Sequence, residues 1–243
     1  MRIQQLSILL VIILGFSVSV NDAKASPALH SAFTPKLSGI KTLDLNLVPQ
    51  VTTEDNVNKV FGHFLFALKT KDTAFLNWID RKGPIPIQAF GIFLNKVYEY
   101  GDSERKTIID ILNSLDFKKQ SGMKALYDFI TEDVENEFSV SLPQDAKSRL
   151  SGLRQINFLV LLDNVSKETV RAHVNMILLA MTKSINAYFD LMDIRQDFSD
   201  KELLLLLSEF RKFSKDTQAK IKEGILTMKP DMAHSVKSLY DLM

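Results

Sequence analysis

The feature that most constrains the fold is the return of apolar side chains every three or four positions along almost the whole chain after residue 52. This spacing places them on one face of an α-helix, whereas a half-buried strand alternates apolar and polar residues. The longest such pattern covers residues 167–192 and would extend over about seven helical turns. Because strand-like alternation is absent, the sequence predicts an all-α bundle or array of about eight to ten helices.

Helix-start signals indicate how the region 52–243 is divided. Ser199 and Glu202 form a capping-box pair, in which each side chain bonds to the backbone of the other residue. Pro143 is expected to begin a helix that runs to about Leu162, because proline is tolerated in a first helical turn. We therefore expect one all-helical domain over 52–243, with a possible subdivision near 139–143.

The N-terminus has the layout of a secretory signal peptide. Arg2 precedes an apolar run, and Ala23-Lys24-Ala25 supplies a small-residue cleavage pattern. Cleavage would remove residues 1–25 and leave Ser26 at the mature N-terminus. An uncleaved anchor is the alternative, although no stop-transfer flank follows. Residues 26–51 hold several prolines and no sustained apolar period, so they are expected to form a flexible leader.

Charge and cysteine content limit the classes of function. Removing residues 1–25 leaves 28 basic and 28 acidic residues, which gives no electrostatic basis for binding nucleic acid or anionic lipid. The absence of cysteine excludes disulfides, thiol nucleophiles and thiolate metal sites. We expect a protein that is secreted into an extracellular or periplasmic space, with no membrane association after cleavage.

No pattern in the sequence indicates an enzyme. There is no glycine-rich phosphate loop and no Gly-x-Ser-x-Gly elbow. The four histidines are scattered, at His30, His63, His173 and His234, and none has a partner at a standard ligand spacing. The sequence therefore predicts no catalytic residue, no metal ligand and no cofactor. Asn164 begins a sequon that would be glycosylated only on a eukaryotic secretory route.

Aromatic residues crowd the N-terminal third of the helical region. Bulky apolar side chains there could line a cavity for a lipid or another apolar ligand, or fill an ordinary close-packed core. The residues concerned are Phe61, Phe64, Trp78, Phe90 and Phe93.

One segment resembles a known family. Trp78-Ile79, Pro86, Ala89-Phe90 and Leu94 are similar to the tryptophan-centred half of the WY-type helical domains of secreted oomycete effectors, and Tyr127 would supply the tyrosine half. The resemblance covers about 60 residues. It implies a cysteine-free helical bundle that acts inside a host cell by binding host proteins. The Arg-x-Leu-Arg translocation motif of that family is absent from this sequence.

The leucine run at 203–207 is the candidate partner-binding site. Leu203, Leu206 and Leu207 share one helical face, whereas Leu205 falls among charged neighbours and Leu204 lies at the border. Another helix could cover this side, with the polar neighbours reaching around it to water. If these two leucines are instead exposed within a charged rim, they form a small binding surface. The sequence thus favours a non-catalytic interaction protein with an unknown protein partner. The alternative is an extracellular carrier of an apolar ligand.

Overall fold

The structure is a computed structural model of the chain. It describes residues 27–44, 47, 54–81, 86–115, 122–135, 139–162, 166–195 and 197–243. The predicted signal peptide and the sequon at Asn164 lie outside these ranges. Within them the predicted all-α class is confirmed, since the chain forms twelve α-helices and one 3-10 helix and no strand.

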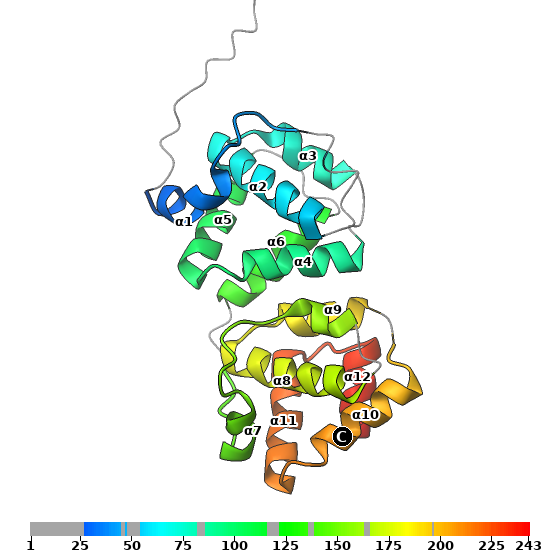
Figure 1. The fold of residues 1–243 in the computed structure, drawn as a ribbon. Coiled ribbons are helices and arrows are strands. Elements are labelled where there is room, and N and C mark those ends of the chain that lie inside the picture. The colour runs from blue at the N-terminus through cyan, green and yellow to red at the C-terminus, as the bar shows by residue number, and fades with distance from the viewer. Residues whose placement is uncertain are drawn as a thin grey trace, which may run out of the picture.

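Six helices form an N-terminal lobe, in the upper half of Figure 1. α2 packs against α1, α3, α4 and α5, and α6 packs against α3 and α5. Their bounds are α1 Pro27–Leu37, α2 Glu54–Thr70, α3 Thr73–Arg81, α4 Ile87–Val97, α5 Asp102–Ser114 and α6 Gly122–Glu135.

The remaining helices form a C-terminal lobe around α8, which contacts α9, α10, α11 and η2. The short helix α12 closes this lobe by packing on α9, α10 and α11. The bounds are α7 Gln144–Arg149, η2 Phe158–Leu162, α8 Lys167–Lys183, α9 Ala187–Ile194, α10 Asp200–Phe210, α11 Lys215–Met228 and α12 His234–Leu242. None of the helices in the described ranges combines the length and apolar character that a membrane crossing requires.

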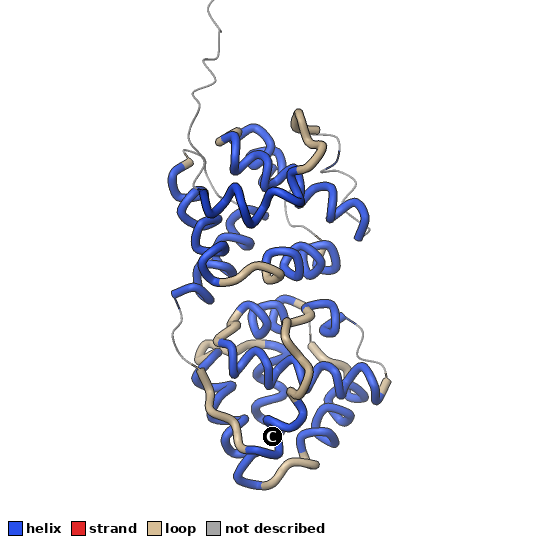
Figure 2. Tube along the Cα trace, turned by 60° about the vertical axis from the view of Figure 1, so that its left-hand side comes forward, coloured by secondary structure: helices blue, strands red, loops and turns tan. Residues whose placement is uncertain are grey.

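The two lobes are stacked (Figure 2), and across their junction α4 packs against η2 and α6 packs against α9. Phe158 of η2 is fully buried between the lobes, with its ring 5.0 Å from that of Tyr98 and 6.0 Å from that of Tyr188. The apolar core is therefore continuous across the junction.

Part of the expected flexible leader is helical. Residues 27–37 form α1, which packs on α2 and α5. Phe33 is fully buried, and its ring lies 4.5 Å from that of Tyr100. The prolines suggested a coil, but Pro27 stands at the first helical position, where its missing N–H is no loss. Burial of Phe33 then stabilises the turn that follows.

The long helix expected over 167–192 is two helices. α8 ends at Lys183, because Ser184 adopts a left-handed backbone with φ of 56°. α9 begins three residues later and runs in a new direction, although both helices are buried in the core. Apolar spacing alone did not reveal the break, whereas the polar pair Ser184 and Asn186, both types that favour caps and turns, marks it.

The helix expected from Pro143 to about Leu162 is also shorter. α7 ends at Arg149, and the chain then turns through Gly152, whose φ is 83°. Glycine adopts this left-handed conformation without steric cost and is the usual stop after a helix. The apolar run Phe158–Leu162 forms the 3-10 helix η2, which packs against α4 of the N-terminal lobe.

Candidate functional site

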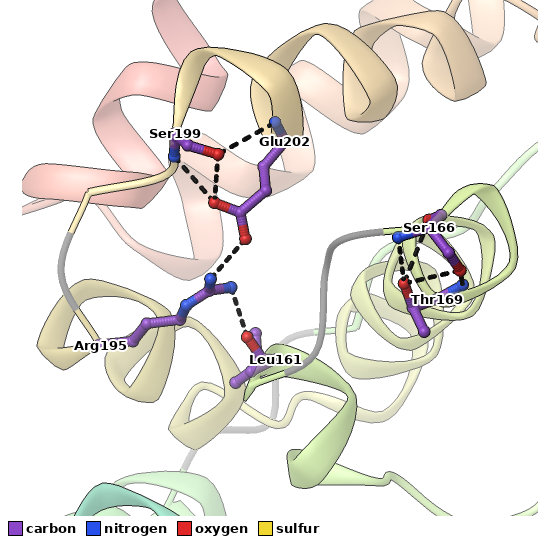
Figure 3. Close-up of polar contacts among 6 residues, drawn as sticks. All are labelled: Leu161, Ser166, Thr169, Arg195, Ser199 and Glu202. Atoms are coloured by element: carbon purple, nitrogen blue, oxygen red, sulfur yellow. Dashed lines mark hydrogen bonds and ion pairs between the residues drawn. The ribbon is translucent and has the colours of Figure 1, made fainter.

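The helix α10 begins as the sequence predicted. The Ser199 hydroxyl accepts a hydrogen bond from the Glu202 backbone N–H at 3.3 Å, and the Glu202 carboxylate accepts from the Ser199 N–H at 2.8 Å (Figure 3). This capping box confirms the predicted start of the helix. A second box, between Ser166 and Thr169, starts α8.

Two of the three carboxylates on α10 point inward, and the third, Asp200, is exposed. Glu202 and Glu209 are both buried, although their residue type suggested a solvated face. Glu202 accepts a 2.5 Å hydrogen bond from Arg195, and Glu209 accepts a 3.3 Å hydrogen bond from Arg149. Burial tends to raise the pKa of each carboxyl. The Ser199 N–H and Arg195 outweigh it at Glu202, and Lys212 followed by Arg149 outweighs it at Glu209, so both pKa values lie below the ordinary range.

These inward ion pairs determine how the two candidate leucines lie. Leu205 is on the same helical stripe as Glu202 and Glu209, three residues after the first and four before the second. It is half-buried and packs against the core, which agrees with the covered alternative for this residue. Leu204 is instead the exposed residue, with 69% of its surface accessible.

The outward face of this helix combines an apolar residue with charged and polar ones. Lys201, Leu204, Ser208 and Arg211 follow one another at helical spacing, and all four are exposed. We call this set the α10 stripe. Both glutamates face the other way, whereas the exposed acidic residue Asp200 lies four residues before Leu204, beside the stripe.

Within the described ranges, the large exposed apolar side chains lie in one lobe. Among the described residues, the large apolar side chains that are more than two-fifths exposed all belong to the C-terminal lobe. They are Ile194, Leu204, Leu226 and Leu242. Single exposed leucines are normal, but their restriction to one lobe distinguishes its surface from that of the other.

The aromatic residues predicted to line an apolar pocket pack against one another. The Phe93 ring meets those of Phe61 and Phe64 nearly edge-on, at centroid distances of 5.2 and 5.3 Å. Phe90 contacts the ring of Phe129, and Trp78 is half-buried against the core instead of fully enclosed. These contacts are those of a filled core.

A buried polar network at the lobe junction was not found by sequence reasoning. Asp133 of α6 accepts hydrogen bonds from the Tyr98 hydroxyl of α4 and from the backbone N–H of Ala187 in α9, the latter at 3.2 Å. Burial raises the pKa of Asp133 to about 7, although the hydrogen bonds and the nearby Arg105 oppose this shift. The three partners are 35 and 54 residues apart in sequence, so no local pattern indicates their meeting.

A second buried carboxylate lies on α9. Asp190 pairs with Lys229 of α11 at 2.8 Å. Burial raises the pKa of Asp190 to about 6, with Lys229 opposing the shift and Glu132 adding to it. Asn186 donates to Glu132 at 3.0 Å, so these groups join α6, α9 and α11. The network fixes the position of α9 between the lobes.

The four histidines lie on four different helices, namely α1, α2, α8 and α12. Among the described residues, no three histidine or acidic side chains are grouped so that they could hold a metal ion. His173 is fully buried beside the rings of Tyr188 and Phe198, and neither of its ring nitrogens has a hydrogen-bond partner in the described part of the chain. Burial, with a smaller contribution from Arg195, lowers the pKa of His173 to about 3.

Comparison of the chain with protein-family models, with curated proteins and with solved structures found no significant match.

Proposed function

We propose that this protein is a secreted, non-catalytic helical interaction protein that binds a protein partner through its C-terminal lobe. The contact surface is the α10 stripe, with Leu204 at its centre. The secretion part of the proposal rests on the sequence of residues 1–25. The resemblance to WY-type effectors adds a host protein as the partner.

The observation that carries the proposal is the exposure of Leu204 between Lys201 and Arg211. An apolar centre with a polar rim is the usual anatomy of a protein interface. The charged neighbours of Leu204 are two cations, Lys201 and Arg211, and one acidic residue, Asp200, so the net positive charge favours a partner surface that presents an apolar pocket with an acidic edge. Burying the exposed part of Leu204 would contribute about 1–2 kcal/mol to binding.

The neighbouring leucine offers a matched control for folding. Leu204→Glu places a charge on an already exposed position and should leave stability nearly unchanged. Leu205→Glu places the charge where the side chain packs on the core, and should destabilise the fold by about 1–3 kcal/mol. Thermal unfolding of the two variants therefore tests the orientation of α10 before any partner is known.

Binding is tested by placing a photo-crosslinking amino acid at Ser208, which lies in the stripe, and identifying what it captures from the medium or host extract. The affinity of the captured protein for purified variants is then measured by calorimetry. Leu204→Glu should weaken binding about tenfold or more, since it removes apolar contact and faces an acidic rim. Lys106→Glu, an exposed change on α5 of the other lobe, should alter binding less than twofold. Equal binding by wild type and Leu204→Glu would overturn the proposal.

The carrier alternative is not proposed, because the aromatic rings that would line the ligand site contact one another. Organic extraction of the purified protein followed by mass spectrometry separates the two functions. A stoichiometric lipid would favour the carrier over the interaction protein.

A further inference from the structure

A cleft of about 460 Å³ opens at the lobe junction. Its N-terminal-lobe wall comes from the end of α4 and the start of α5, which supply Tyr98, Tyr100 and Arg105. The C-terminal-lobe wall comes from the segment before η2 and from the α8–α9 connection, and includes Arg154, Ile156, Lys183 and Ile185. A volume of this size suits a small organic molecule.

The ion pairs around the cleft leave an excess of positive charge. Glu99 pairs with Lys96 at 2.7 Å, and Asp102 pairs with Arg105, so each lining carboxylate already has a cation. Arg154 and Lys183 are exposed, and neither takes part in an ion pair among the residues that the structure describes. Two positive charges therefore remain uncompensated at the C-terminal-lobe wall.

Both walls of the cleft carry hydrogen-bond donors. The Lys183 ammonium donates to the Arg154 carbonyl, which fixes it beside the cleft and leaves further N–H donors on the same group. The Arg105 side chain is only 8% exposed, and its guanidinium lies 4.4 Å from the centroid of the Tyr98 ring. Its Nε is buried and has no hydrogen-bond partner in the described part of the chain, which is an unusual state for a charged donor.

Apart from Gln155 and Gly101, the rest of the lining is apolar or aromatic. Ile156 and Ile185 are buried, and Tyr98 and Tyr100 line the other wall. A purely ionic ligand would gain nothing from these groups. A molecule with an anionic group and an aromatic body would satisfy both parts of the lining.

From this arrangement we infer that the lobe-junction cleft is a binding site for a small aromatic anion, with Arg154 and Lys183 holding the anionic group and the apolar lining holding the ring. The bound molecule contacts both lobes. This site lies at the C-terminal end of α8 and involves no residue of the α10 stripe. It is therefore independent of the proposed partner surface.

Two probes that share an aromatic body test the site. The anionic probe is 8-anilinonaphthalene-1-sulfonate, and the neutral one is N-phenyl-1-naphthylamine, which lacks the sulfonate. Fluorescence titration of the full mature chain should show saturable binding of the anionic probe with a stoichiometry near one. The neutral probe should bind at least tenfold more weakly, because it makes no use of the two cations.

The variant Arg154→Glu/Lys183→Glu reverses both charges and should weaken binding of the anionic probe about tenfold or more. Lys167→Glu/Lys215→Glu makes the same change in net charge at exposed positions away from the cleft and outside the α10 stripe, and should alter the affinity less than twofold. Circular dichroism checks the fold of each variant. If the double reversal does not fold, Arg154→Gln/Lys183→Gln takes its place, with an expected weakening of about threefold or more.

Three results would overturn the inference. The first is wild-type protein that fails to bind the anionic probe. The second is equal loss of affinity in the cleft variant and the charge-matched control, which would indicate a general effect of net charge. The third is equal binding of the anionic and neutral probes, which would indicate an apolar surface without anion recognition.

Discussion

Asp133 offers a stability test that is independent of any ligand. Its carboxyl is 6% exposed and lies where α4, α6 and α9 meet. Burial raises its pKa from the ordinary value of 3.8 to about 7. The native protein therefore holds a proton that the unfolded chain releases at lower pH. The stability from this proton is fully present below about pH 4 and is lost as the pH rises through about 7.

The size of this effect follows from the shift. A change of one pKa unit corresponds to about 1.4 kcal/mol, so the difference between 3.8 and about 7 amounts to about 4 kcal/mol of unfolding free energy. Asp133→Asn has nearly the same shape and cannot ionise. The amide of the variant keeps an oxygen that can accept one of the two hydrogen bonds. Because it cannot ionise, residue 133 should cause no loss of unfolding free energy as the pH rises.

The assay is urea denaturation at intervals between pH 4 and pH 8, followed by circular dichroism. The measured quantity is the unfolding free energy of wild type minus that of Asp133→Asn, because His173 gives the wild-type curve an opposite slope over part of the range. This difference should fall by about 4 kcal/mol from pH 4 to pH 8. Asp128→Asn, on the same helix but exposed and paired with Lys124, should give a difference that changes by less than about 1 kcal/mol. A flat difference for Asp133→Asn would show that its pKa is not raised and would refute the reasoning.

Three further predictions concern other parts of the chain. His173 has a pKa lowered to about 3 by burial, so its contribution to stability is lost as the pH falls from about 6.5 towards 3, and His173→Leu should remove an acid-side loss of about 5 kcal/mol in urea denaturation. Gly224→Ala would place a Cβ 2.1 Å from Met181 Cε and 3.1 Å from Val140 Cγ2, so its thermal unfolding should show a loss of about 1–3 kcal/mol despite the better helix propensity of alanine. An unchanged or raised melting temperature would show that Met181, although fully buried, can move aside. The secreted protein should begin near Ser26, and N-terminal sequencing that still finds Met1 would contradict the predicted cleavage.

Local sequence determined the helical class and the better-marked helix starts. Apolar spacing and capping residues act within one or two turns, so a pattern such as Ser199 followed by Glu202 specifies its structure wherever the helix is placed. The burial of Phe61 and Phe64 follows from the same periodicity. Hydrophobic pattern is therefore a reliable guide to element type here.

Helix breaks were less visible, because apolar spacing continues across them. Met181 before Ser184 and Ile185 after it are both buried, so the apolar pattern continues where the backbone turns. The left-handed residue and the following cap decide the break, and the packing of α9 against α6 and α12 stabilises it. In this region a capping or turn residue within the apolar stripe therefore indicates the helix end, which the stripe does not.

Only the tertiary structure decided which charged residues face inward. Glu202 is buried beside Arg195 and Glu209 beside Arg149, both from other elements, while Leu204 is exposed and Leu205 packs on the core. The same holds for Asp133, whose partners are distant in sequence, and for the cleft, whose two walls belong to different lobes. The sequence determines which side chains can ionise, but the free energy of a charge depends on neighbours that folding alone brings together.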